Sequence, residues 1–266
     1  MKIISANTNG IRAAAGKGFF DWILKEDLDV ICIQETKAHE WQLSDPVFNP
    51  ENYFRYFSEA QKKGYSGVAI YTKRKPDRVI KTLGFDLADL EGRYIQADFD
   101  DLNLSICSLY LPSGSSSELR QVEKIKFMGI YEKILQAQRN SGRSFIICGD
   151  WNIVHKEIDI KNFKSNQKSS GCLPEERAWL DKLLNPEKDK KEQWLDGFRV
   201  LNQEKDQYTW WSSRRKICWD NNIGWRIDYQ MITPDLKNKI KKVEIYKAQR
   251  FSDHAPVLIE YELEGF

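Results

Sequence analysis

Several apolar runs of this sequence have carboxylate, carboxamide or imidazole side chains at or beside their ends. The run over residues 145–148 leads through a glycine to Asp150, and Asn152 follows two positions later. Because side chains alternate along a strand, we expect Asp150 and Asn152 to point to one face. The other places with this pattern hold Asn7 and Asn9, Glu35, Asp228, and Asp253 with His254.

These side chains could together hold a divalent cation. Charged groups at buried strand ends are costly unless they are paired or bind a metal, and converging carboxylates raise one another's pKa. A hard cation removes the repulsion, and oxygen donors with few imidazoles suit Mg²⁺ or Mn²⁺ better than zinc. For each residue alone a turn or a helix cap is the simpler explanation, but for the whole set we favour one shared site.

The elements that must position these residues alternate between strand and helix patterns. We predict helices over residues 18–25, 116–139 and 174–184. The second is expected to begin at a capping box of Ser115 and Glu118 and to bury an apolar stripe of Leu119, Val122, Ile125, Ile134 and Leu135. Strands are predicted over residues 2–6, 30–34, 67–72, 94–99, 104–110, 144–148, 225–232, 243–246 and 256–261.

Composition limits the class of protein. The chain has 266 residues, 41% of them hydrophobic, and no linker, repeat or low-complexity tract, so one domain over 1–266 is expected. Mixed strands and helices predict a layered α/β fold, with two packed sheets or one sheet covered on both faces as alternatives. A net charge of +2 is too small to predict nucleic-acid binding by itself.

Cysteine usage and hydropathy bear on the compartment. The five cysteines are odd in number and form no C-x-x-C motif, which favours free thiols in a reducing compartment. The N-terminus does not resemble a signal peptide, and no run approaches the roughly 20 apolar residues of a membrane span. We therefore expect a protein without membrane association that is intracellular, and cytoplasmic if its source is a prokaryote.

Six ordered motifs resemble those of the exonuclease III / apurinic-apyrimidinic endonuclease family, within the endonuclease/exonuclease/phosphatase superfamily. They are NTNGIRA from Asn7, QETK from Gln34, YLP from Tyr110, GDWNIVHKEID from Gly149, GWRIDY from Gly224 and SDHAP from Ser252. The resemblance covers nearly the whole chain. It implies a four-layer α-β-β-α sandwich of two packed mixed sheets flanked by helices, with the active site at one edge.

The resemblance also implies an activity. It implies an Mg²⁺-dependent phosphodiesterase, with Mn²⁺ as a substitute, that cuts duplex DNA on the 5′ side of abasic sites. It also implies 3′-phosphodiesterase, 3′-phosphatase and 3′→5′ exonuclease activities. The expected partner is double-stranded DNA with abasic or 3′-blocked lesions, and the expected state is a monomer.

Roles for single residues follow from the same resemblance. Asp150 is expected to activate the attacking water, Asn152 to position it, and Tyr110 to reach the phosphate. His254, held by Asp228, is expected to contact the scissile phosphate. The metal ligands are expected among Glu35, Asn7, Asp150, Asn152, Asp253 and His254, with Glu35 as the main one. The expected DNA contacts are Asn9, Arg12, Lys37, Asn166, Trp210, Arg214 and Trp225.

Some positions depart from the family pattern. Ser113 and Ser116 stand where some relatives carry an asparagine and an arginine that enters the DNA stack. The segment YTWWSSRRK could compensate, since Trp210 resembles the aromatic residue of the abasic pocket, with Trp225 as a neighbouring wall. Trp211 could belong either to that pocket or to the core.

The shared catalytic core leaves the substrate open, because a fold does not determine a function. A nonspecific nuclease or a phosphatase of the same superfamily is the alternative to abasic-site incision. A binding module without catalysis is disfavoured, because every core catalytic position is filled.

Overall fold

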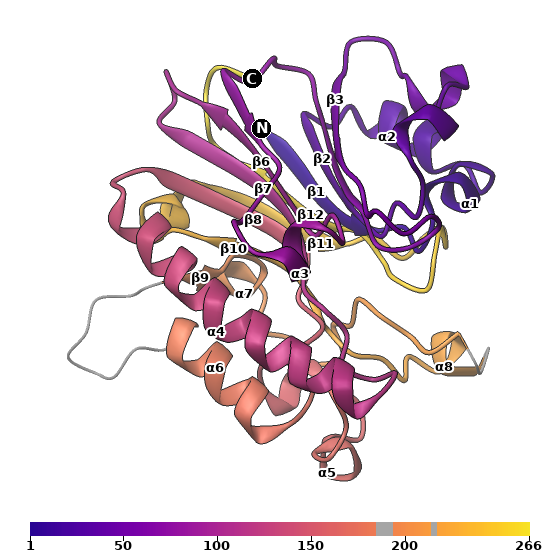
Figure 1. The fold of residues 1–266 in the computed structure, drawn as a ribbon, viewed down its shortest axis with the longest axis vertical. Helices are drawn as coiled ribbons and strands as arrows, with labels where there is room; N and C mark the ends of the chain where they lie inside the picture. The colour runs from indigo at the N-terminus through magenta and orange to yellow at the C-terminus, as the bar shows by residue number, and fades with distance from the viewer. Residues whose placement is uncertain (185–193, 214–216) are drawn as a thin grey trace.

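The computed structural model describes residues 1–184, 194–213 and 217–266 (Figure 1). Arg214, which the sequence suggested as a DNA contact, lies outside these residues. The five cysteines are buried and free. No described helix combines the length and the apolar character that crossing a membrane requires.

The described strands form two mixed six-stranded sheets. The first sheet has the order β11-β12-β1-β2-β4-β3, with β1 Lys2–Asn7, β2 Val30–Gln34, β3 Phe54–Ser58, β4 Val68–Thr72, β11 Ile240–Ile245 and β12 Val257–Tyr261. The second has the order β5-β6-β7-β8-β10-β9, with β5 Arg78–Ile80, β6 Tyr94–Phe99, β7 Leu104–Tyr110, β8 Ser144–Asp150, β9 Leu195–Asp196 and β10 Asp228–Ile232.

Helices cover the outer face of each sheet (Figure 1). On the first sheet they are α1 Ile11–Ala15 and α2 Phe19–Glu26, and on the second they are α3 Asp86–Asp89, α4 Glu118–Asn140 and α6 Pro174–Leu184. The remaining described helices are the short α5 Phe163–Asn166, α7 Gly197–Leu201 and α8 Ile217–Asp220. Phe198 of α7 and Cys218 of α8 pack into the core between the sheets. Short 3₁₀ turns lie at Glu40–Gln42, Pro46–Phe48, Glu157–Asp159 and Pro234–Lys239.

Strand alternation explains the layers. Ile3, at one position of β1, packs between the two sheets, whereas Ile4, at the next position, packs outward against the helix α2. On the other side of the molecule, Phe127 of α4 and Trp179 of α6 pack on the outer face of the second sheet. The predicted four-layer α-β-β-α sandwich is therefore confirmed, and the alternative of a single covered sheet is wrong.

Strand boundaries differ from the predictions where polar residues interrupt the apolar pattern. The strands β3, β5 and β9 were not predicted, because β3 contains Arg55 and the other two are very short. The strand β11 begins at Ile240 instead of residue 243, because Lys241 and Lys242 on its exposed part conceal the pattern. The prediction over 225–232 was too long, because Trp225 makes only isolated bridges and β10 begins at Asp228.

The start and the buried face of α4 were also predicted incorrectly. Ser117 caps the helix by accepting a hydrogen bond from the Arg120 N–H at 3.2 Å, because it is the residue directly before the first turn; Ser115 instead bonds Ser113. Leu119, Val122 and Ile125 of the predicted stripe are exposed by 78%, 66% and 40%. The buried face consists of Lys124, Phe127, Met128, Tyr131 and Leu135.

Two substitutions on α4 test which face supports the fold. We expect Phe127→Ala to lower the free energy of unfolding by about 3–5 kcal/mol, because it leaves a cavity beneath the sheet. Leu119→Ala is the matched control on the exposed face and should change it by no more than about 0.5 kcal/mol. Urea denaturation measures both, and equal losses would contradict the assignment of the two faces.

Candidate active site

Strand pairing brings the predicted site residues to one edge of both sheets. The strands β1 and β2 are parallel, with Asn7 opposite Gln34, and β7 and β8 are parallel, with Tyr110 opposite Asp150. All four strands therefore end at the same edge of the sandwich. Asp228 joins them because it begins β10, which runs antiparallel to β8 and pairs Asp228 with Asp150.

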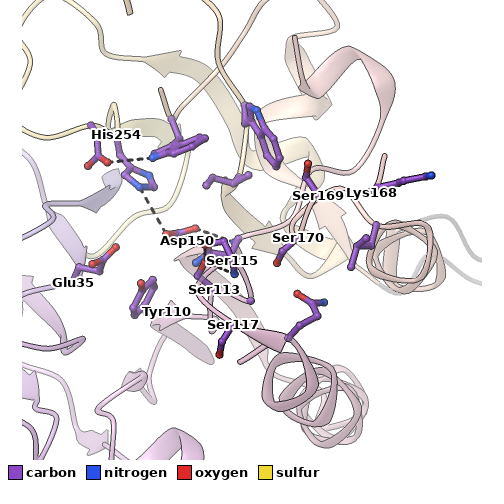
Figure 2. A pocket seen from close by; sticks show the side chains of 18 of the residues that line it. Glu35, Tyr110, Ser113, Ser115, Ser117, Asp150, Lys168, Ser169, Ser170 and His254 are labelled. Atoms are coloured by element: carbon purple, nitrogen blue, oxygen red, sulfur yellow. Dashed lines mark hydrogen bonds and ion pairs between the residues drawn. The ribbon is translucent and has the colours of Figure 1, made fainter. Parts of the chain in front are cut away.

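Carboxylates from the two sheets meet at this edge. Asn7 Nδ2 donates one hydrogen bond to Glu35 Oε1 and one to Asp150 Oδ2, both at 2.8 Å. One ligand atom each from Glu35, Asp150 and His254 lies within 4.8 Å of the other two. Figure 2 shows Glu35, Tyr110 and His254 around Asp150. Three polar groups far apart in the sequence thus form one cluster.

The surroundings of Asp150 disfavour its charged form. Burial and the negative charges of Asp228 and Glu35 raise the pKa of Asp150 to about 8, although His254 and the Asn152 N–H oppose this shift. The Asn152 N–H donates to Asp150 Oδ1 at 2.9 Å. Both carboxylate oxygens are therefore held by donors, while the group remains able to take up a proton near neutral pH.

His254 has the opposite preference. Burial alone would lower its pKa, but the carboxylate of Asp228, and the charges of Asp150 and Asp253, outweigh burial and raise the pKa of His254 to about 10. Nδ1 lies 2.9 Å from Asp228 Oδ2, and Nε2 lies 3.9 Å from Asp150 Oδ2. The imidazole is therefore held as a cation with its Nε2 directed toward Asp150.

The donor set fits a divalent cation. Two carboxylates converge beside the imidazole of His254, and the repulsion between the carboxylates is of the kind that a bound cation removes. Asn7 directs its amide nitrogen at the carboxylates, while its oxygen accepts the Asn9 N–H at 2.9 Å. Glu35 and Asp150 are thus the oxygen donors that face the centre of the cluster.

Asn152 and Asp253, the other predicted ligands, lie beside the cluster and have other partners. Asn152 Nδ2 donates to the Leu111 carbonyl at 2.9 Å. The Asp253 carboxylate accepts from Asn9 Nδ2 at 2.8 Å and from Trp210 Nε1 at 3.2 Å. Their role as metal ligands, like that of Asn7, stays a prediction.

A cavity of about 650 Å³ opens from this cluster. Trp210, Trp225 and Ile227 form an apolar part of its lining, the tryptophan wall. The rings of Trp210 and Trp225 pack edge to face, with their centroids 5.8 Å apart. Trp211 is buried in the core and its Nε1 donates to Asn222 Oδ1 at 3.2 Å, so it does not belong to this wall. The cavity is also lined by Ser113, Ser115, Ser117, Lys168, Ser169 and Ser170, which Figure 2 labels.

The predicted DNA contacts differ in their distance from the cavity. Trp210 and Trp225 line it. Lys37 does not line it, but its Nζ lies 2.8 Å from Oε2 of the lining residue Glu35 and donates a hydrogen bond to Asn9 Oδ1. Arg12 is exposed on α1, and Asn166 on α5 donates to the Asn162 carbonyl at 2.9 Å; neither lines this cavity.

Two buried cations near the site were missed by the sequence analysis. Arg93 lies beneath Tyr110, with its guanidinium 4.8 Å from the ring centroid, and donates to the Tyr110 carbonyl at 3.1 Å. Lys124 donates to the Asn152 carbonyl at 2.8 Å. In the sequence, Arg93 is marked only as a basic residue directly before an apolar strand. Lys124 is marked only as a lysine that shares a helix face with Phe127, Met128 and Tyr131.

Histidine titration in the metal-free protein tests the charge arrangement. We expect His254 to stay protonated until the pH approaches about 10, and Asp228→Asn to lower its pKa to about 6.5 or below, because the raising carboxylate is lost. NMR spectroscopy measures both values, with His155, whose pKa burial lowers, as the internal reference. A wild-type His254 that loses its proton near pH 6.5 would contradict the arrangement.

Comparisons with known proteins show which family this chain belongs to. The profile described as "Endonuclease/Exonuclease/phosphatase family" matches residues 4–254. The chain is 37% identical over 262 residues to an exodeoxyribonuclease of Bacillus subtilis, covering 97% of this chain and 98% of the relative. It is 33% identical over 270 residues to the DNA-(apurinic or apyrimidinic site) endonuclease of Dictyostelium discoideum, covering 99% of this chain and 71% of the relative.

A solved structure shares the fold. The AP endonuclease from Archaeoglobus fulgidus superposes with a TM-score of 0.86 at 24% identity, covering 99% of this chain and 100% of that chain. At this identity the likeness concerns the fold alone. From the profile match and the two sequence relatives, we conclude that the chain belongs to the Endonuclease/Exonuclease/phosphatase family.

Proposed function

We propose that this protein is a DNA-repair phosphodiesterase that cuts duplex DNA on the 5′ side of abasic sites. We further propose that it removes blocking groups and nucleotides from 3′ ends. The observation that carries the proposal is the convergence of Glu35, Asp150 and His254 in a chain whose relatives are named as an exodeoxyribonuclease and an abasic-site endonuclease. The proposed cofactor is Mg²⁺, with Mn²⁺ as a substitute.

Glu35 and Asp150 are the residues that would hold the metal. His254 is less suited as a ligand, because its charged form has no free lone pair and Asp228 favours that form. When bound, the ion stabilises negative charge on the phosphate and on the leaving oxygen. Asn7, which bonds both carboxylates, maintains their separation.

The remaining groups suit proton transfer and phosphate binding. Asp150, which Asn7 Nδ2 and the Asn152 N–H orient, is the carboxylate placed to accept the proton of the attacking water. Burial and the charge of Glu35 raise the pKa of Tyr110 well above its usual value, so its hydroxyl stays a donor to the phosphate. Protonated His254 donates to the oxygens where charge develops.

The tryptophan wall accounts for a preference for abasic nucleotides. A sugar without a base can turn out of the helix at lower cost than an intact nucleotide, and it fits against Trp210, Trp225 and Ile227. The residues proposed to hold the DNA backbone are Arg12, Lys37, Asn9, Asn166 and Arg214.

A nuclease with broad specificity is the second candidate. The cavity is also lined by small serine side chains, including Ser113 and Ser115, so an intact terminal nucleotide has more room beside them than beside large residues. This favours 3′→5′ removal of normal nucleotides alongside abasic-site incision.

Its assembly and location are part of the proposal. We propose a monomer that acts inside the cell, in the cytoplasm if the source is a prokaryote. Free, buried cysteines are the usual state of thiols in a reducing compartment, which supports this location.

Incision of a duplex that carries one tetrahydrofuran abasic analogue tests the activity. We expect cutting on the 5′ side with Mg²⁺ or Mn²⁺ and none with EDTA. Asp150→Asn should lower kcat about 10²–10⁴-fold, because the proton acceptor is lost. Asp101→Asn, which changes an exposed aspartate paired with Arg74, is the matched control and should keep full activity. Absence of incision with metal present would refute the proposal, and equal rates on intact duplex ends would favour the second candidate.

Substitution of Trp210 tests the origin of the preference. We expect Trp210→Ala to raise KM for the abasic duplex by about 10-fold or more, because contact between an aromatic ring and the displaced sugar is lost. Leu201→Ala, at a largely exposed position of α7, is the control. Gel-based incision assays at several substrate concentrations separate KM from kcat, and an unchanged KM would remove Trp210 from the binding pocket.

A further inference from the structure

We propose that Lys124 is a positioning residue for the reaction. It acts through the Asn152 carbonyl and thereby fixes the turn that directs Asp150 and Asn152 into the cavity. This inference rests on the proposed function, because it takes Asp150 and Asn152 as the residues that carry the chemistry.

Lys124 makes a charged contact in a place that excludes water. Its side chain and that of Glu176 are fully buried, and Nζ lies 2.6 Å from Glu176 Oε1. The same Nζ donates to the Asn152 carbonyl at 2.8 Å. The ion pair therefore joins α4 to α6 and connects both to the chain directly after β8.

Asn152 has a backbone conformation that needs support. Its φ of 52° lies in the left-handed region, which asparagine tolerates better than most residues but does not prefer. Its N–H holds Asp150 Oδ1 at 2.9 Å, and its side chain holds the Leu111 carbonyl. A shift of this turn would move the Asp150 carboxylate and the Asn152 amide together.

Glu176 fixes the segment on the other side of this turn. Its Oε2 accepts the Gly171 N–H at 2.6 Å and the Leu173 N–H at 3.0 Å. Gly171 has a φ of 90°, and a Cβ there would lie 2.8 Å from the Asn152 carbonyl oxygen. The Asn152 carbonyl is thus enclosed by Gly171 and reached by Lys124, with no space for a side chain between them.

Stability alone does not explain a charged pair at this place. Replacing a buried ion pair by well-packed apolar groups is often neutral or stabilising, because two charges no longer lose their water. The next positions after Lys124 on the same face of α4, Phe127 and Met128, hold apolar side chains. The contact with Asn152 gives this lysine a task that an apolar residue could not perform, since no apolar side chain donates to the carbonyl.

The test removes both charges together, so that neither is left buried alone. In Lys124→Met/Glu176→Gln we expect kcat on the abasic duplex to fall about tenfold or more, while KM stays within about twofold, because misplaced catalytic groups slow the chemical step. Lys182→Met/Glu132→Gln is the matched control, since it removes an exposed ion pair between the same two helices. Lys124→Arg keeps a charged donor and should retain most of kcat.

A measurement without metal or substrate gives a second readout. We expect the Asn152 backbone amide to exchange its hydrogen about tenfold faster in Lys124→Met/Glu176→Gln than in the wild type, because its bond to Asp150 loosens. Wild-type kcat together with unchanged exchange would overturn the proposal, and so would a rise in KM with kcat unchanged.

Measurements on the wild-type protein decide two further cases. If the double variant does not fold, a Lys124 ammonium signal that exchanges slowly in ¹⁵N-edited NMR spectra supports the proposal, and exchange as fast as that of Lys182 overturns it. If the wild type does not incise abasic DNA, the proposed function fails, while the amide exchange comparison still decides the role of Lys124.

Discussion

The site depends on a single amide group that bonds carboxylates from both sheets. Asn7 closes β1 and donates to Glu35, after β2, and to Asp150, at the end of β8. Without this donor the two acids would face each other directly across the join between the sheets. Just below them, Gln34 Nε2 donates to Ser108 Oγ at 2.9 Å, so the sheets are also connected by a neutral hydrogen bond where the acids meet.

Two buried aspartates, Asp150 and Asp159, show that the neighbouring charges decide whether such a group is structural or reactive. Asp159 would have a raised pKa from burial alone, but Arg226 and Arg199 lower it below its usual range. It therefore stabilises the fold at every pH above the pKa of an unfolded aspartate, and this contribution is lost only as the pH falls toward its own low pKa. Asp150 faces acids instead, and its pKa is raised. A buried carboxylate among arginines is structural, whereas one among carboxylates can take a proton.

The sequence predicted the strand ends and their polar residues well, because a charged group after a buried run is unusual enough to be noticed. It predicted α4 poorly. Lys124 faces inward where the pattern asks for an apolar residue, while Leu119 and Val122 face solvent, so counting apolar residues selects the wrong face. Trp211 could not be assigned either, because a tryptophan occurs both in cores and in pocket walls and the sequence does not distinguish the two environments. Which side chains meet depends on strand pairing between distant segments, and periodicity carries no information about it.

The same long-range pairing has a consequence during synthesis. Asn7 and Asp150 are 143 positions apart, and Asp228 and His254 are separated by a further 26. A ribosome-bound chain that ends soon after Asp150 already contains the acids but lacks the imidazole and its carboxylate partner. Contacts of such long range also form late in folding, because closing large loops is costly before many other contacts exist. An unfinished copy of the chain therefore lacks the histidine that we propose as the hydrogen-bond donor to the phosphate.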